Sequence, residues 1–118
     1  MEKMMIRIAR IEDVPKMDNP HGIDVRKLHD SEHAQVMHIE LGPGEGLRRH
    51  STPVDVVFFV LEGRAVIEIG DERLKVSAGT LVESPSRVPH RVMNDDQTVL
   101  RFLVIKIPRP QEATRLLE

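Results

Sequence analysis

Residues 44–63 read GEGLRRHSTPVDVVFFVLEG, and this stretch holds the strongest structural pattern in the chain. Seven of the eight residues from Val54 to Leu61 are apolar, which predicts a strand covered on both faces and central to the core. The glycines that flank the stretch indicate turns, so we expect a turn, a strand and a second turn. One histidine, His50, precedes the apolar run.

Short apolar runs continue on both sides of this stretch. They are separated by Gly, Pro, Asp or Asn, which is typical of many short strands rather than helices. The expected strands cover residues 6–11, 34–41, 54–61, 64–69, 73–76, 80–83, 88–93 and 98–107. A tight turn at Gly70-Asp71 predicts a hairpin, and residues 111–117 are expected to form a short terminal helix. The pattern predicts an all-β fold, either an antiparallel sandwich or a small barrel.

Composition excludes several function classes. The 118 residues predict one domain, with residues 1–33 as an N-terminal strand and loops, 34–107 as the barrel and 108–118 as a tail. The lack of cysteine excludes thiol catalysis, disulfides and cysteine-bound metals. A net charge of −2 and the lack of Tyr and Trp argue against nucleic-acid binding.

Residues 1–10 resemble neither a secretion signal nor a membrane span, so we expect a cytoplasmic protein without membrane contact.

A second stretch, residues 79–94, reads GTLVESPSRVPHRVMN. Together the two stretches resemble the two motifs of the cupin superfamily, which are G-x5-H-x-H-x3/4-E-x6-G and G-x5-P-x-G-x2-H-x3-N. Matching positions in this chain are Gly44, His50, Gly63, Gly79, Pro85, His90 and Asn94. The resemblance covers 36 residues and implies a double-stranded β-helix, or jelly roll, with a ligand pocket inside the barrel mouth.

The resemblance also implies a divalent metal (Zn, Fe, Mn or Ni), held by two His and one Glu of the first motif and one His of the second. This chain keeps His50 and His90, but it has Thr52 and Val56 at the other two positions. Valine offers no lone pair, and catalytic zinc sites usually have three protein ligands. We therefore expect His50 and His90 to form only a weak, incomplete metal site.

Seven side chains are predicted to line the pocket: His50, Thr52, Val56, Phe58, His90, Arg48 and Arg87. The two arginines are either solvated surface residues or donors for an anionic ligand. Arg87 stands where the second motif has a glycine, so its loop must avoid a positive φ or accept strain.

The remaining histidines suggest no third metal ligand. His38 is expected to face out of the barrel, because it alternates with the apolar Met37 and Ile39. Solvated loop positions are expected for His21, His29 and His33. We also expect Asp55 to point out of the barrel.

Several functions remain open at this point. The first is a small-molecule-binding cupin, with an anionic metabolite as one candidate ligand. The second is a metal-dependent oxygenase, isomerase or decarboxylase that uses His50, His90 and an unidentified third ligand. The histidine pair itself has two alternative roles. In the first it is purely structural, with the two side chains hydrogen-bonded to each other or to Thr52. In the second the pair acts as a general acid and base or holds a metal ion.

Two further possibilities come from the family. The family's metal-free epimerases use a tyrosine acid, which this chain lacks. An interaction subunit with a vestigial pocket is not excluded by any residue. Small cupins commonly pair, so the resemblance also implies a homodimer.

Overall fold

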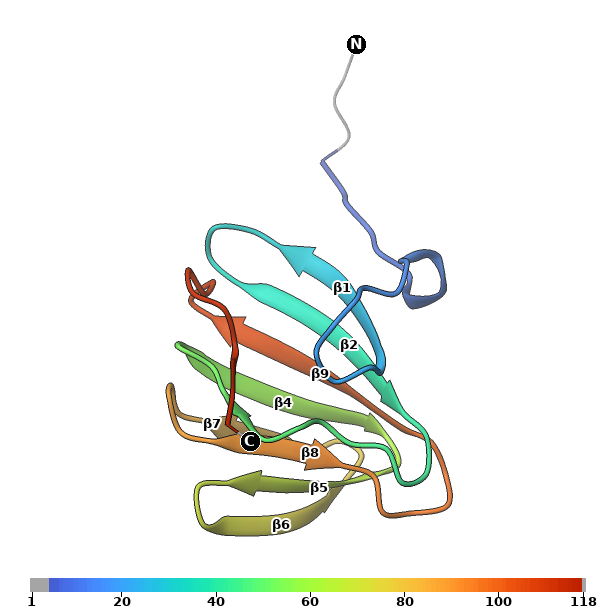
Figure 1. Ribbon diagram of the computed structural model, residues 1–118. Helices are drawn as coiled ribbons and strands as arrows, with labels where there is room; N and C mark the ends of the chain where they lie inside the picture. The colour runs from blue at the N-terminus through green and yellow to red at the C-terminus, as the bar shows by residue number, and fades with distance from the viewer. Residues whose placement is uncertain (1–4, 118) are drawn as a thin grey trace.

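Two β-sheets face each other in the computed structural model, which describes residues 5–117 (Figure 1). These residues form ten strands and one 3-10 helix, η1 (Ile11–Asp13), so none of their helices is long and apolar enough to cross a membrane. The strands are β1 (Asp24–Asp30), β2 (Gln35–Leu41), β3 (His50–Ser51), β4 (Asp55–Glu62), β5 (Arg64–Ile69), β6 (Glu72–Ser77), β7 (Leu81–Ser84), β8 (His90–Met93), β9 (Leu100–Ile107) and β10 (Arg115–Leu116). The predicted all-β fold is confirmed.

Each sheet has five antiparallel strands. One has the order β1-β2-β9-β4-β7, and the other has the order β10-β3-β8-β5-β6. The core lies between them and is built from alternate residues of the strands, as period-2 side-chain geometry requires.

Strand β4 occupies a central position between β9 and β7, as the apolar run predicts. Its inner side chains, Val56, Phe58 and Val60, are fully buried against the opposite sheet. On the outer face Phe59 is only half-buried and Leu61 is exposed, so the expected cover on both faces is incomplete. The predicted β5–β6 hairpin is present, with Gly70 at a φ of 58° in its turn.

The expected strand at residues 6–11 is wrong. Residues 6–10 have no regular structure and lead away from the sheets, with Ile6 and Ile8 largely exposed (Figure 1). The first strand is β1 instead, and a register shift between Lys27 and His29 interrupts its alternation. That irregularity hides the strand from a period-2 search, because only one of its side chains, Val25, is buried.

The expected terminal helix is also wrong. Residues 115–116 form the short strand β10, which pairs with the edge of β3 through Leu116 and His50. Seven residues make a marginal helix, whereas an open sheet edge offers backbone hydrogen-bond partners directly. This pairing brings the tail, including Thr114, over one end of the barrel.

Asn94 closes the opposite end of the barrel, just after β8. Its side-chain amide donates to the carbonyl oxygens of Leu41 at 3.0 Å and Thr98 at 2.8 Å. Its side-chain oxygen accepts from the backbone N–H of Asp96 at 3.0 Å. These bonds tie the loops after β2 and β8 together and leave the other end of the barrel for a cavity.

Candidate functional site

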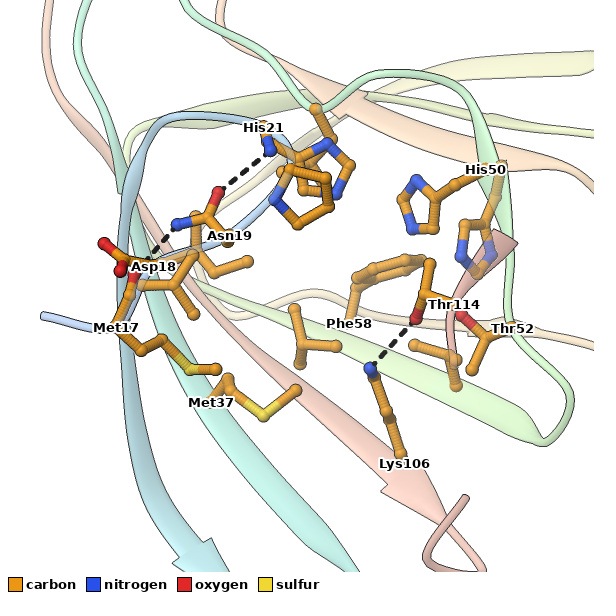
Figure 2. Close-up of a pocket in the computed structure, with 17 residues that line it drawn as sticks. Met17, Asp18, Asn19, His21, Met37, His50, Thr52, Phe58, Lys106 and Thr114 are labelled. Carbon is orange, nitrogen blue, oxygen red and sulfur yellow. Dashed lines mark hydrogen bonds between the residues drawn. The ribbon is translucent and has the colours of Figure 1, made fainter. Parts of the chain in front are cut away.

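A cavity of about 210 Å³ opens between the sheets at the end where β8 begins (Figure 2). Most of its wall is apolar, and it includes Met17, Met37, Ile39, Val56, Phe58 and Val104. Strands of both sheets and the loop before β1 contribute side chains. Five of the seven predicted pocket residues line it, namely His50, Thr52, Val56, Phe58 and His90.

His50 lies on β3 with only 6% of its surface exposed. Its Nδ1 lies 2.7 Å from the carbonyl oxygen of Arg48, which can only accept, so Nδ1 carries the proton. In the neutral ring the lone pair is therefore on Nε2. Burial lowers the pKa of His50, outweighing the carbonyl bond that raises it, and keeps the ring neutral at pH 7.

His90 lies opposite His50 in the pairing of β3 with β8. Its Nδ1 shares a 2.6 Å hydrogen bond with the hydroxyl of Ser84, while its buried Nε2 has no partner among the described residues. Burial lowers the pKa of His90 to about 3, helped by the nearby His50 and Lys106. A buried ring nitrogen without a partner is costly, so this atom is ready to accept or donate to a ligand.

The two imidazoles meet edge to face, with ring centroids 4.5 Å apart, and His90 also packs on Phe58. The expectation that they bond to each other or to Thr52 is wrong. Each ring instead turns its Nδ1 to a different group, Arg48 for His50 and Ser84 for His90. The geometry therefore fixes both rings while leaving their Nε2 atoms for other contacts.

His21 is a third imidazole at this site, which the sequence analysis placed in solvent. Its ring centroid lies 5.0 Å from that of His50, and its Nδ1 accepts the backbone N–H of Arg48 at 2.9 Å. Asn19 holds the loop in place, since its side chain bonds to the backbone of residues 17, 21 and 23. The Asn-Pro-His-Gly sequence signals a turn, but no local pattern shows where that turn packs. His29 and His33 are exposed, as expected, although His29 lies on β1 rather than in a loop.

Lys106 is the most informative residue that the sequence analysis missed. It extends from β9 into the cavity, and its Nζ lies 3.4 Å from the Thr114 hydroxyl (Figure 2). Burial lowers its pKa, and the charge of Lys27 adds to this. The signal was available, because residues 100, 102, 104 and 106 share one face and the first three are Leu, Phe and Val.

The side chains do not fit the divalent metal that the family resemblance implies. Thr52 and Val56 occupy the two lost ligand positions and line the cavity, and Val56 cannot coordinate a cation. No group of three or more His, Cys, Asp or Glu side chains within residues 5–117 is arranged to hold a metal ion. His50 and His90 are thus left as a pair of imidazoles beside an amine.

Arg48 and Arg87 do not line this cavity, although both were predicted to do so. Arg87 is exposed beside a separate depression and pairs with Glu112 at 3.2 Å. Its φ of 65° shows that the loop accepts the left-handed conformation for which the family uses glycine. Asp55 points outward as expected, and its carboxylate accepts the Ser86 backbone N–H at 2.8 Å.

His38 faces out of the barrel, as its alternation predicts, yet it is 1% exposed. Its Nε2 accepts from Arg101 Nε at 3.1 Å. The N-terminal segment passes nearby, because Arg26 donates to the carbonyl oxygens of Ile11 and Val14. Burial lowers the pKa of His38, followed by the charge of Arg101, but this imidazole is not part of the cavity.

Comparisons with known proteins agree with the fold. An uncharacterized protein of Methanocaldococcus jannaschii is 30% identical over 89 residues, which cover 75% of this chain and 77% of that protein. A solved RmlC-like cupin family protein with a double-stranded β-helix fold, from the same organism, superposes with a TM-score of 0.76 at 24% identity, covering 92% of this chain and 96% of its own. The polyketide cyclase RemF of Streptomyces resistomycificus superposes with a TM-score of 0.82 at 21% identity, covering 97% and 87%.

These likenesses identify the fold as a double-stranded β-helix. The family model of the cupin domain matches residues 37–106, which is more than half of the chain. The match includes both motif histidines and Lys106. With the two motifs, the facing sheets and the cavity between them, the chain belongs to the cupin superfamily.

Proposed function

We propose that this cupin binds a small organic molecule in the cavity between its sheets, with no metal ion in the binding site. The observation that carries the proposal is the cavity itself, an apolar chamber with imidazoles and an amine on its wall. A mostly apolar pocket with a few converging polar groups is the usual form of a small-molecule site.

The size and polar groups narrow the type of ligand. At about 210 Å³ the cavity lies below the roughly 300–1,000 Å³ of drug-sized sites, so it suits a molecule of metabolite size. His50 and His90 are neutral at pH 7 and offer hydrogen-bonding nitrogens rather than fixed charges. An anionic ligand remains part of the proposal, although the arginines first considered for it lie outside the cavity.

The metal-dependent enzyme receives less support from the side chains. It needs a third ligand near His50 and His90, and the nearest imidazole, His21, already uses Nδ1 to accept the Arg48 N–H. Because that Nδ1 accepts, the proton of the neutral His21 ring is on Nε2, which then offers no lone pair to a metal ion. His50 differs, since its Nδ1 donates to a backbone carbonyl and its Nε2 keeps a lone pair. A metal-free binding role accounts for the same residues without an additional ligand.

Methionine methyl NMR tests the proposal directly, because Met17 and Met37 line the cavity while Met93 does not. We expect titration with hexan-1-ol to shift the Met17 and Met37 signals saturably and to leave Met93 unchanged. EDTA should not alter the response. A response that disappears in EDTA, or no saturable shift at either cavity methionine, would overturn the proposal.

Two variants serve as a matched pair for this experiment. Val104→Phe places a ring in the cavity and should abolish the response, whereas Val36→Phe adds the same ring on the outer face of the same sheet. Equal responses in the two variants would show that the probe binds elsewhere.

A homodimer is a further proposal, supported by the family resemblance. Half-buried apolar side chains on the outer face of the β1-β2-β9-β4-β7 sheet also support it, including Val57, Phe59 and Leu103. Sedimentation equilibrium measures it. A mass near 13.4 kDa at micromolar concentrations would contradict it.

A further inference from the structure

Lys106 is a half-buried amine on the cavity wall, and it forms no ion pair with another residue of the described chain. It projects from β9 on the same face as Val104 and Phe102, both buried in the core. Its Nζ has one hydrogen-bond partner among the described residues, the neutral Thr114 hydroxyl at 3.4 Å. No carboxylate within residues 5–117 lies at ion-pair distance from it.

The groups around this amine make the lack of a partner more costly. His50 and His90 lie on the cavity wall and carry no negative charge, and Lys27 adds a positive potential. The one acidic side chain of the lining, Asp18, is exposed in the loop before β1. Burying an ammonium group without a counter-ion is unfavourable, so the site gains free energy when an anion enters.

The chemistry of the cavity limits the kind of anion. A single lysine matches a single negative charge, and the lining contains no arginine and no helix N-terminus of the kind that binds phosphate. Apart from the amine, the imidazoles and a few other polar side chains, the wall is apolar, with Met17, Met37 and Val25 available for a hydrocarbon group. A monocarboxylate with a short apolar body fits both features.

We propose that Lys106 and Thr114 form a carboxylate-binding end of the cavity and that the ligand is a small, mainly apolar monocarboxylic acid. The carboxylate accepts from Lys106 Nζ and the Thr114 hydroxyl, while the hydrocarbon body lies against the methionines. This inference rests on the proposed small-molecule function and adds the ligand class and the residue that selects it. The tail contributes to the site, because β10 holds Thr114 over the cavity.

The experiment compares hexanoate with hexan-1-ol, which has the same chain length without the charge. Dissociation constants come from the Met17 and Met37 methyl shifts at pH 7. We expect wild-type protein to bind hexanoate at least about tenfold more tightly than hexan-1-ol, which is the usual scale of a charge-assisted hydrogen bond. Lys106→Met should remove this preference while retaining hexan-1-ol binding.

Two more variants keep the outcome clear. Lys75→Met removes a lysine that pairs with Asp95 and Asp96 far from the lining, so it should keep the hexanoate preference. Thr114→Val should reduce the preference severalfold, and it alters the exposed tail rather than the core. If hexanoate and hexan-1-ol bind equally, or if Lys106→Met weakens both alike, the carboxylate assignment is overturned and the small-molecule proposal stands. If neither probe binds, the proposed function itself fails.

Discussion

Asn94 and His90 lie at the two ends of β8, and both are 2% exposed. Asn94, at the closed end, uses both side-chain polar atoms in hydrogen bonds to the backbone. His90, at the open end, bonds through Nδ1 and leaves Nε2 buried without a partner in the described chain. The comparison distinguishes polar groups that stabilise the barrel from polar groups held ready for a ligand.

The same contrast extends to the neighbours of each residue. At the closed end the backbone loops approach one another so closely that a Cβ on Gly63 would collide with the Val99 carbonyl oxygen. At the open end Lys106 and three imidazoles line a cavity. We therefore expect substitutions at the closed end to change the free energy of unfolding most, and substitutions at the open end to change ligand binding most.

The largest effect is expected for Gly63→Ala. Gly63 has a φ of 82°, and the added Cβ would meet the backbone of Val99 and Leu100, which cannot rotate away. Left-handed strain and overpacking together should lower the free energy of unfolding by about 3 kcal/mol or more. Urea denaturation followed by circular dichroism measures the change.

Gly79→Ala is the matched control for Gly63→Ala. Gly79 has a similar φ of 87°, but an added Cβ would meet nothing within 4 Å, so only the backbone strain remains. We expect a loss of about 1 kcal/mol. Equal losses at both glycines would show that the close approach at the closed end has no energetic weight.

The next effect is expected for Asn94→Ala, which leaves the carbonyl oxygens of Leu41 and Thr98 without their donor. We expect a loss of about 2–3 kcal/mol, because the bond to the Leu41 carbonyl is buried and the bond to the Thr98 carbonyl is partly buried. Asn19→Ala at the open end also removes several hydrogen bonds to the backbone, but water reaches that loop. Its loss should be about 1 kcal/mol, and a larger loss at Asn19 than at Asn94 would contradict the comparison.

These two ends also show how far sequence reasoning reaches. The closed end could be predicted, because the motif glycines and Asn94 depend on local backbone geometry that short patterns encode. The strand that carries His90 was predicted in the same way, whereas the two-residue strand β3 that carries His50 was not. Thr52 and Val56 were assigned to the pocket because they stand at the motif's ligand positions, and Phe58 because it shares the strand parity of His50. All three side chains line the cavity.

The open end was harder to predict from the sequence, because segments that are distant in the chain form it. His21 arrives from a loop fixed by Asn19, and Thr114 arrives through the β10 pairing, neither of which has a periodic signal. Arg48 and Arg87 were assigned to the cavity by proximity in sequence, yet their side chains lie outside it. Lys106 was within reach, since a lysine among buried alternate positions of a strand is itself a signal of function.

Acid should destabilise the protein through His90. Its pKa is about 3 in the folded state against about 6.5 when unfolded, so between these values the unfolded chain binds a proton that the folded chain does not. Its contribution to stability is complete above pH 6.5 and is lost as the pH falls toward 3. Between pH 7 and pH 5 this amounts to about 2 kcal/mol.

Urea denaturation at pH 7 and pH 5 measures this dependence. His90→Gln should reduce the loss on acidification, whereas His33→Gln, which alters an exposed imidazole, should retain it. The lowered pKa values of His50 and His38 add losses of the same sign, so some dependence should persist in the variant. An unchanged loss in His90→Gln would show that its open-end environment does not suppress protonation.

The smallest effect is expected for Lys106→Met, and here the free energy of unfolding should rise rather than fall. Methionine keeps the unbranched stem and removes a half-buried amine that has no carboxylate at ion-pair distance within residues 5–117, so the free energy of unfolding at pH 7 should rise by about 1 kcal/mol. Lys75→Met, which removes an exposed amine paired with Asp95 and Asp96, should produce no rise. Urea denaturation of both variants measures the difference. If Lys106→Met raises the free energy of unfolding and also abolishes hexanoate binding, the amine at the open end lowers stability in return for ligand recognition. If the substitution lowers the free energy of unfolding, Lys106 belongs with Asn94 among the groups that stabilise the barrel.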